Sequence, residues 1–375
     1  MRAISNRIRR LSLSVFYVVI IVAVLLNCSG CGKKSKKLTS KTGAKNIILF
    51  IGDGMGLAQV KAAQYYANGG TEKFSFEKFP YYTILQTHNA QGGITDSAAS
   101  GTAMSTGHKV NNGVVALKNP GDGRELETVL EVFSRNNRST GLVTTTNISH
   151  ATPASFGAHV STRTDYNGII SDYLNQTKPD VLFGGSEYFT VLQATSSGYL
   201  VTTNSFDLNG LLPSPSIPLA GLFGDSHLPY EYDGVGNLPH LSDSTEVALA
   251  ALSKDIDGFF LLVEGGRIDH ACHSNDLQRM IPEVIEFAKA VQVAVEWAKG
   301  RDDTLILVTA DHECGGLTVL SSSTAGNYPD VNWSTNGHTS TAIPLYGLGV
   351  GADGVPLISD NTTIHELILH AGQVR

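Results

Sequence analysis

Four segments of the chain are rich in apolar and β-branched residues and lack the alternation of polar and apolar positions that marks a half-exposed strand. They are residues 46–51, 141–146, 258–263 and 304–309. Segments of this kind are typical of strands buried on both faces, as in a parallel sheet covered by helices. Further strands are predicted at 180–183 and 345–350, and helices at 57–67, 125–136, 277–299 and 364–370. The pattern predicts an α/β fold, and only residues 186–240 give no clear signal.

A run of small residues follows the first predicted helix, with the sequence TDSAASGTA at residues 95–103. These side chains cannot fill a core, but they let the start of a helix pack closely on another element, with Asp96 or Thr95 as its N-cap. Ser97 would then lie in the first turn, where unpaired N–H groups and the helix dipole favour an anion or an alkoxide. Ser97 is therefore the candidate nucleophile. The alternative is a capped helix with a close-packed alanine face.

Carboxylates and histidines follow the four main strands. They are Asp53 after the first, His150 after the second, Glu264 and Asp269 after the third, and Asp311 and His312 after the fourth. The hydroxyl of Thr152 accompanies His150. In open α/β sheets ligands gather at the carboxyl ends of strands, so these side chains are expected to converge. They would repel or desolvate one another unless metal bound them. Nitrogen and oxygen donors suit zinc where histidine is present and magnesium where all donors are oxygen.

Each of these pieces also has a plainer interpretation. His150, His270, His312 and His338 could be hydrogen-bonded structural histidines, and Arg163 a solvated cation. Asp269 and His273 are four residues apart, so they could grip one metal from a helical turn or form an exposed helical pair. Pro153 can open a short helix at its first position, which would leave Thr152 just outside it. Their joint occurrence at strand ends favours the metal interpretation.

The glycines at residues 52–56 raise a dinucleotide-binding alternative, because a strand precedes them and a helix follows. The spacing is G-x-G-x-G without the usual third glycine, and Asp53 would direct a carboxylate at the pyrophosphate. A cation beside Asp53 is the better interpretation.

The N-terminal residues form a separate piece. Basic residues precede an apolar run at 11–26, and small residues and Cys31 follow it, which predicts a signal peptide at 1–31, of bacterial lipoprotein type. Cleavage elsewhere or an uncleaved anchor is the alternative. Residues 32–45 are expected to be a tether and 46–375 a catalytic domain. The protein would be exported to the periplasm or outer surface and lipid-anchored at Cys31, its one expected contact with a membrane.

The charge of the body limits its partners. Residues 1–37 hold eight basic and no acidic residues, so the remainder carries 19 basic against 34 acidic residues, a net charge of −15. This acidic balance argues against nucleic acid as a partner and suits a protein that holds cations. Within the body, Cys272 and Cys314 are too few for a disulfide framework. They flank predicted ligands and are interpreted as spectators, although they could pair in an oxidising compartment.

Six ordered motifs resemble those of the alkaline phosphatases. They are DGMG at 53–56, TDSAASGTA at 95–103, HATP at 150–153, VEGGRID at 263–269, TADHE at 309–313 and GHT at 337–339. The resemblance implies a three-layer αβα sandwich around a large mixed, mostly parallel sheet. Only 25 residues separate His312 from His338, which resembles the compact bacterial form with a short crown segment. Many relatives have a longer crown that helps to form a homodimer, so dimer formation is left open.

The resemblance also implies a role for each candidate site residue. One zinc ion would be held by Asp269, His273 and His338, a second by Asp53, Asp311 and His312, and magnesium by Asp53, Thr152 and Glu264. Ser97 would attack phosphorus and Arg163 would clamp the phosphate oxygens, with His150 and His270 beside the ligands. The family carries aspartate or histidine at the place of His150. Histidine removes a carboxylate near the third ion, so magnesium is expected to bind more weakly.

The activity implied is hydrolysis of small phosphate monoesters of broad type through a phosphoserine intermediate. The alternatives are a phosphodiesterase of the same superfamily and a non-catalytic lipoprotein that binds metal or phosphate. A diesterase would usually carry threonine as nucleophile and lack the Arg163 clamp.

Overall fold

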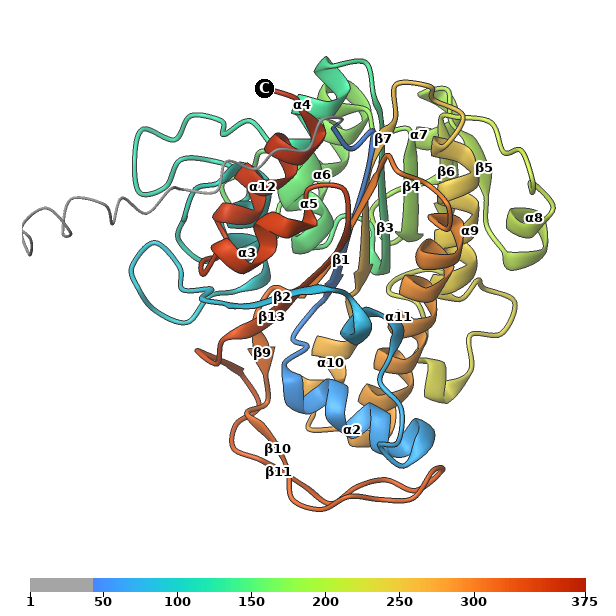
Figure 1. Ribbon diagram of the computed structural model, residues 1–375. Helices are drawn as coiled ribbons and strands as arrows, with labels where there is room; N and C mark the ends of the chain where they lie inside the picture. The colour runs from blue at the N-terminus through green and yellow to red at the C-terminus, as the bar shows by residue number, and fades with distance from the viewer. Residues whose placement is uncertain (1–42) are drawn as a thin grey trace, which may run out of the picture. The chain divides into compact units, whose positions relative to one another are not determined.

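A nine-stranded sheet forms the middle layer of the domain (Figure 1). The computed structural model describes residues 43–375. The strand order is β2 (Tyr81–Leu85), β13 (Ile343–Gly349), β8 (Thr304–Ala310), β1 (Asn46–Gly52), β7 (Phe259–Gly265), β3 (Ser139–Asn147), β4 (Val181–Gly185), β6 (Leu219–Leu222) and β5 (Leu200–Thr202). Neighbouring strands are parallel except for β13, which is antiparallel to β2 and β8. The predicted mixed, mostly parallel sheet is confirmed.

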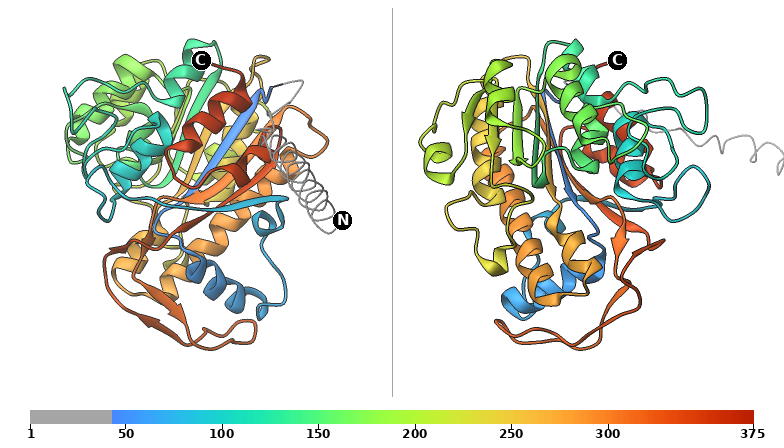
Figure 2. Two further views of the ribbon diagram at one scale, coloured as in Figure 1. Left: turned by 60° about the vertical axis from the view of Figure 1, so that its left-hand side comes forward. Right: turned by 180° about the vertical axis from the view of Figure 1, so that it is seen from behind.

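Helices cover both faces of this sheet, which confirms the three-layer sandwich (Figures 1 and 2). On one face lie α4 (Val129–Arg135), α5 (Ala151–Gly157) and α12 (Thr363–Gly372), with α3 (Ser97–Thr106) and α6 (Tyr166–Asp172) outside them. On the other face lie α9 (Leu241–Leu252) and α11 (Leu277–Trp297), with α2 (Leu57–Asn68) and α10 (Arg267–His273) packed against α11. The short helices α7 (Val191–Ser196) and α8 (Ser205–Asn209) lie near β5 and α9.

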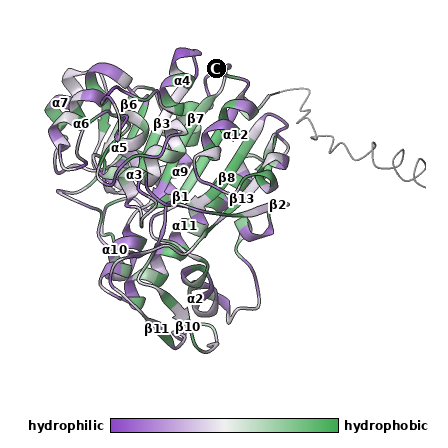
Figure 3. Cartoon of the chain, turned by 90° about the vertical axis from the view of Figure 1, so that its left-hand side faces the viewer, coloured by the Kyte–Doolittle hydropathy of each residue, from purple (hydrophilic) through white to green (hydrophobic). Residues whose placement is uncertain are grey.

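The central strands are mostly hydrophobic (Figure 3). Every residue of β1, β7 and β8 is buried, as the absence of polar alternation predicts. In the parallel register Gly52 of β1 lies opposite Gly265 of β7 and Ala310 of β8. The carboxyl ends of the three strands are therefore level, and the residues that follow them start from one edge of the sheet.

Two small antiparallel pairs lie beyond this edge. They are β9 (Glu313–Cys314) with β12 (His338–Thr339), and β10 (Leu317–Val319) with β11 (Val331–Trp333). The second pair lies within the short segment between His312 and His338. The first pair holds His338 beside the chain that leaves β8.

Several elements differ from the sequence-based predictions. β2 was not predicted, and residues 186–240 hold α7, β5, α8 and β6. The helix predicted to start at residue 125 begins at Val129, because Thr128 and Glu131 form a capping box. α5 begins at Ala151 with His150 as N-cap, so Pro153 is its third residue and Thr152 lies inside it, which corrects the predicted start at Pro153.

The N-terminal predictions fall almost wholly outside the described residues. This applies to the signal peptide at 1–31, the acylation of Cys31 and the tether up to residue 42. Residues 43–45 belong to the folded domain, because Ala44 is fully buried and its N–H donates to the Ala371 carbonyl at 2.7 Å. Among the residues described, no helix combines the length and apolarity needed to cross a bilayer.

The contact between α3 and α5 generates a prediction about stability. A Cβ atom at Gly101 would lie 2.8 Å from the Cβ of Ser155. We expect Gly101→Val to lower the free energy of unfolding by about 1–3 kcal/mol, because overpacking forces the two helices apart. Gly93→Val is the control, since its nearest neighbour, Asn89, is 3.7 Å away. Equal urea midpoints for the two variants would contradict the close packing.

Candidate active site

Buried carboxylates gather where the central strands end. Asp53, Glu264 and Asp311 are all fully buried. Burial raises the pKa of Asp53 well above its usual value, and the nearby charges of Asp311 and Asp269 raise it further. Burial also raises the pKa of Glu264, to about 7. Negative charge is therefore costly at this edge of the sheet, and a bound cation would relieve the cost.

A first donor group consists of Asp269 and His273 on α10 and His338 on β12. His273 Nε2 lies 3.1 Å from Asp269 Oδ2 and 3.1 Å from His338 Nε2. His338 Nε2 lies 3.6 Å from Asp269 Oδ1. The helical turn predicted from the four-residue spacing of Asp269 and His273 is confirmed.

Backbone contacts fix which nitrogen of these two rings is available. The Nδ1 atom of His273 lies 2.7 Å from the Asn336 carbonyl oxygen, and that of His338 lies 3.0 Å from the Thr95 carbonyl oxygen. A carbonyl only accepts, so each Nδ1 carries a hydrogen and each neutral ring presents a bare Nε2. Two lone pairs and a carboxylate thus share one position, which is the usual arrangement around zinc.

A proton can occupy the position between these donors in place of a metal ion. The hydrogen bond with Asp269 raises the pKa of His273 to about 9. Burial acts to raise the pKa of Asp269, but the hydrogen bond from His273 and the charges of His312 and His338 lower it below its usual value. The carboxylate is therefore ionised, as a metal ligand must be.

A second donor group, Asp53, Asp311 and His312, lies beside the candidate nucleophile. His312 Nε2 is 3.1 Å from Asp311 Oδ2, 3.6 Å from Asp53 Oδ1 and 3.4 Å from Ser97 Oγ. Asp311 Oδ1 accepts the Gly54 N–H at 3.0 Å, so only its other oxygen faces the group. Asp269 also lies within reach, because one of its oxygens is within 4.8 Å of donors of Asp53 and His312.

A third donor group, Asp53, Thr152 and Glu264, offers only oxygen atoms. His150 lies beside it, with a ring nitrogen within 4.8 Å of carboxylate oxygens of Asp53 and Glu264. One oxygen of Glu264 accepts a hydrogen bond from Thr144, and its other oxygen has no hydrogen-bond partner. Thr144 is a contact that the sequence did not indicate.

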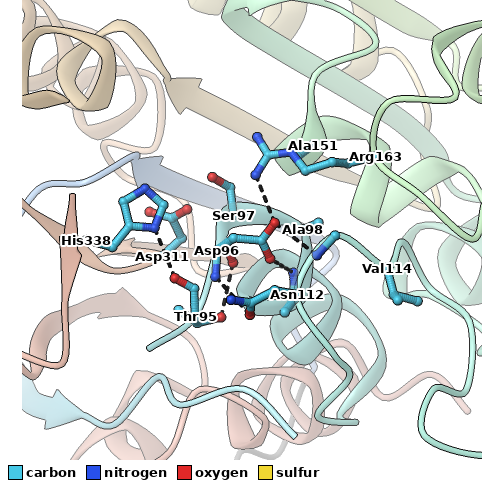
Figure 4. A network of polar contacts seen from close by, with 12 residues as sticks. Thr95, Asp96, Ser97, Ala98, Asn112, Val114, Ala151, Arg163, Asp311 and His338 are labelled. Atoms are coloured by element: carbon cyan, nitrogen blue, oxygen red, sulfur yellow. Dashed lines mark hydrogen bonds and ion pairs between the residues drawn. The ribbon is translucent and has the colours of Figure 1, made fainter. Parts of the chain in front are cut away.

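The start of α3 positions Ser97. Asp96 is the N-cap, and its Oδ1 accepts the Ala99 N–H at 3.0 Å. Its Oδ2 accepts from Arg163 Nη1, also at 3.0 Å, and Figure 4 shows this guanidinium directed at Asp96 beside Ser97. Ser100 Oγ donates to the Asp311 carbonyl at 2.6 Å, so the helix is tied to the end of β8. The predicted cap is confirmed, and it also orients the arginine.

Three neutral histidines lie beyond Arg163. His150, His227 and His270 form edge-to-face pairs with ring centroids 4.6–5.7 Å apart. Burial, and then the nearby rings and arginines, lowers the pKa of His270 to about 3 and that of His150 well below its usual value. Arg163 Nη2 lies 3.2 Å from His150 Nε2, and arginine only donates, so His150 carries its hydrogen on Nδ1. His227 comes from a segment without a clear sequence pattern and was not predicted.

The donor groups fit divalent cations. The buried oxygens that find no hydrogen-bond partner include Asp53 Oδ1 and Oδ2, Thr152 Oγ1, Glu264 Oε1, Asp269 Oδ1 and Asp311 Oδ2. Native proteins leave few buried polar atoms unpaired, and a set this concentrated calls for ions. Imidazole and carboxylate donors suit zinc, and the oxygen-rich third group suits magnesium.

Fold and donor groups together define an α/β protein with a serine at a helix start and a cluster of metal-binding side chains. A family model described as alkaline phosphatase matches residues 44–195 and 183–329. The chain belongs to the alkaline phosphatase family.

Relatives and solved structures agree with this assignment. The chain is 37% identical over 303 residues to alkaline phosphatase 3 of Bacillus subtilis, covering 76% of this chain and 64% of the relative. It is 30% identical over 401 residues to the alkaline phosphatase of Escherichia coli, covering 86% and 84%. The chain thus spans slightly less than two thirds of the length of the Bacillus relative.

Among solved structures, the alkaline phosphatase of the Antarctic bacterium TAB5 is similar, with a TM-score of 0.79 and 30% identity over 88% of this chain and 99% of that one. A histidine-to-aspartate mutant of the TAB5 protein, with Mg bound in the M3 site, has a TM-score of 0.80 and 30% identity over 89% and 99%.

The double role of Asp96 generates a prediction. We expect Asp96→Ala to lower the free energy of unfolding by about 1–2 kcal/mol, because α3 loses its cap and Arg163 loses its partner. Asp96→Asn keeps an oxygen for the Ala99 N–H and should lose less than about 1 kcal/mol. Denaturant unfolding of both variants provides the measurement, and an alanine variant as stable as wild type would contradict the capping role.

Proposed function

We propose that this protein hydrolyses phosphate monoesters to an alcohol and inorganic phosphate. The observation that carries the proposal is the position of Ser97. Its Oγ lies at the positive end of α3, 3.4 Å from His312 Nε2, with buried carboxylates on one side and Arg163 held by Asp96 on the other. Membership of the alkaline phosphatase family supports the same reaction.

The reaction follows from the chemistry of the residues. Ser97 Oγ attacks phosphorus as its proton passes to solvent, and the Oγ–P bond forms while the bond from phosphorus to the alcohol oxygen breaks. The leaving oxygen takes up a proton from solvent and departs as the alcohol. Water then cleaves the phosphoserine, which releases phosphate and restores the hydroxyl. Arg163 is placed to bind two phosphate oxygens through its planar guanidinium, because Asp96 and His150 orient it. In this scheme no residue binds the alcohol part of the ester, so we propose a broad range of small monoesters as substrates.

The proposed ions complete the charge balance. We propose zinc in the first and second donor groups and magnesium in the third, with Asp53 shared between the second and third. When bound, these ions would lower the pKa of the Ser97 hydroxyl and stabilise negative charge on the attacking and leaving oxygens. The unpartnered carboxylate oxygens support this proposal, as do the contacts of Nδ1 of His273 and His338 with backbone carbonyls, which leave Nε2 of each ring to bind a metal.

His150 is proposed to keep magnesium binding weak. It contributes a neutral ring where a carboxylate would add a third negative charge beside Asp53 and Glu264. A histidine-to-aspartate mutant of a related protein is known with Mg in its M3 site, which supports a role for such a position in magnesium binding. Among the residues that the structure describes, His150 is the histidine grouped with Asp53 and Glu264.

Location and assembly are proposed from the sequence alone. The N-terminal pattern supports export and a lipid anchor at Cys31, and the short segment between His312 and His338 leaves a homodimer open.

The nucleophile is tested by substitution. We expect Ser97→Ala to lower kcat/KM for p-nitrophenyl phosphate at alkaline pH by at least about a thousandfold in zinc- and magnesium-loaded protein. Ser105→Ala is the matched control, because its hydroxyl lies on the same helix and donates to the Ser155 carbonyl at 2.5 Å. The bis-ester should be a much poorer substrate than the monoester. Full activity of Ser97→Ala would refute the serine mechanism, and preference for the diester would favour the phosphodiesterase alternative.

The role of His150 is tested by magnesium binding. We expect His150→Asp to bind Mg²⁺ at least about tenfold more tightly than wild type, because it adds a carboxylate to an oxygen donor group. The measurement is the rise in melting temperature with added MgCl₂ in zinc-loaded protein. His150→Asn removes the ring without adding charge and should show a smaller rise. An unchanged magnesium response in His150→Asp would contradict the assignment.

A further inference from the structure

Cys314 lies directly opposite a member of the first donor group. It is the second residue of β9, and in the antiparallel register of β9 and β12 its Cα partner is His338. Side chains of directly paired residues project to the same face of a two-stranded ribbon, with Cβ atoms about 4.5–5.5 Å apart. The Cys314 N–H donates to the Gly54 carbonyl at 3.1 Å, which anchors β9 against the turn that carries Asp53.

The Cys314 sulfur is within reach of the whole first donor group. Its Sγ atom and one donor atom each of Asp269, His273 and His338 all lie within 4.8 Å of one another. The thiol has only a weak contact with protein, a 3.9 Å approach to the Asp269 carbonyl oxygen. Asp269 Oδ1, which is buried and has no hydrogen-bond partner, belongs to the same group and is an independent indication of a cation there.

We propose that the Cys314 thiolate is a fourth donor to the ion held by Asp269, His273 and His338. The inference rests on the proposed metal site. As the ion binds, the sulfur–metal bond forms and the S–H proton leaves to solvent, so no oxidant or other reactant is needed. A carboxylate, two imidazoles and a thiolate make a four-donor set of the kind zinc accepts, and a substrate oxygen would bind the same ion as a fifth ligand, since zinc can expand from four to five ligands. The soft sulfur favours zinc or cadmium over magnesium.

The chain provides a matched control. Cys272 lies on α10 between Asp269 and His273 and is as fully buried as Cys314. Both thiols are free. Among the described residues that could share an ion, however, Cys314 is grouped with the donors and Cys272 is not. A signal that depends on thiol number or burial alone would respond to either substitution.

X-ray absorption of the zinc-loaded full-length protein tests the proposal, with Cys28 and Cys31 replaced by serine in every sample so that Cys272 and Cys314 are the only cysteines present. Excess zinc is removed and metal content is measured. We expect a sulfur scatterer at about 2.3 Å from zinc in wild type and in Cys272→Ser. Cys314→Ser should show only nitrogen and oxygen at about 2.0–2.1 Å. Cobalt-loaded samples give a second readout, because a thiolate-to-cobalt charge-transfer band should be present in the first two proteins and absent from the third.

The outcomes separate this inference from the proposed function. A wild-type spectrum without sulfur, or a sulfur shell that persists in Cys314→Ser, overturns the role of Cys314 even if the protein hydrolyses monoesters. A sulfur shell lost only in Cys314→Ser supports it even if no ester is hydrolysed. If Cys314→Ser folds poorly, the wild-type and Cys272→Ser spectra still decide, since sulfur must be present in both.

Discussion

Mutual repulsion among buried carboxylates is the constraint on which the rest of the site depends. The parallel register brings Asp53, Glu264 and Asp311 to one edge of the sheet, and α10 adds Asp269. At least one oxygen of each of these four carboxylates has no hydrogen-bond partner, and the raised pKa values of Asp53 and Glu264 express the cost of burying them. Cations would supply the missing charge, and the proposed ions would lie where they could stabilise a phosphate group.

The surrounding protein fixes the orientation of each donor. Backbone carbonyls hold the hydrogen of His273 and His338 on Nδ1, so that neither ring can turn its bare nitrogen away without losing a hydrogen bond. Asp96 does two tasks with one carboxylate, since one oxygen caps α3 and the other holds Arg163. The position of Ser97, the proposed nucleophile, is thus coupled to that of Arg163, the proposed phosphate clamp, and neither depends on a flexible side chain alone.

Much of this could be predicted from the sequence, because fully buried strands have an unmistakable composition and because residues that follow parallel strands must converge. β1, β7 and β8 were predicted to within one or two residues at each end, and Asp96 was one of two predicted caps. Short strands such as β5 and β2 were missed, since they contain exposed positions and too few residues to show a period. His227 and Thr144 were missed because their roles depend on contacts between distant segments, which no local pattern encodes.

The first donor group also has a consequence for the unfolded chain. Asp269 and His338 are far apart in sequence, and the Thr95 carbonyl that holds His338 is separated from it by 243 positions. An ion bound by Asp269 and His338 would close a loop of 69 positions, as a cross-link does, and would so remove conformational entropy from the unfolded ensemble while adding bonds to the folded one. A bound ion would lower the rate of unfolding as well as raise the free energy of unfolding, because the C-terminal segment could not leave the sheet until the ion was released.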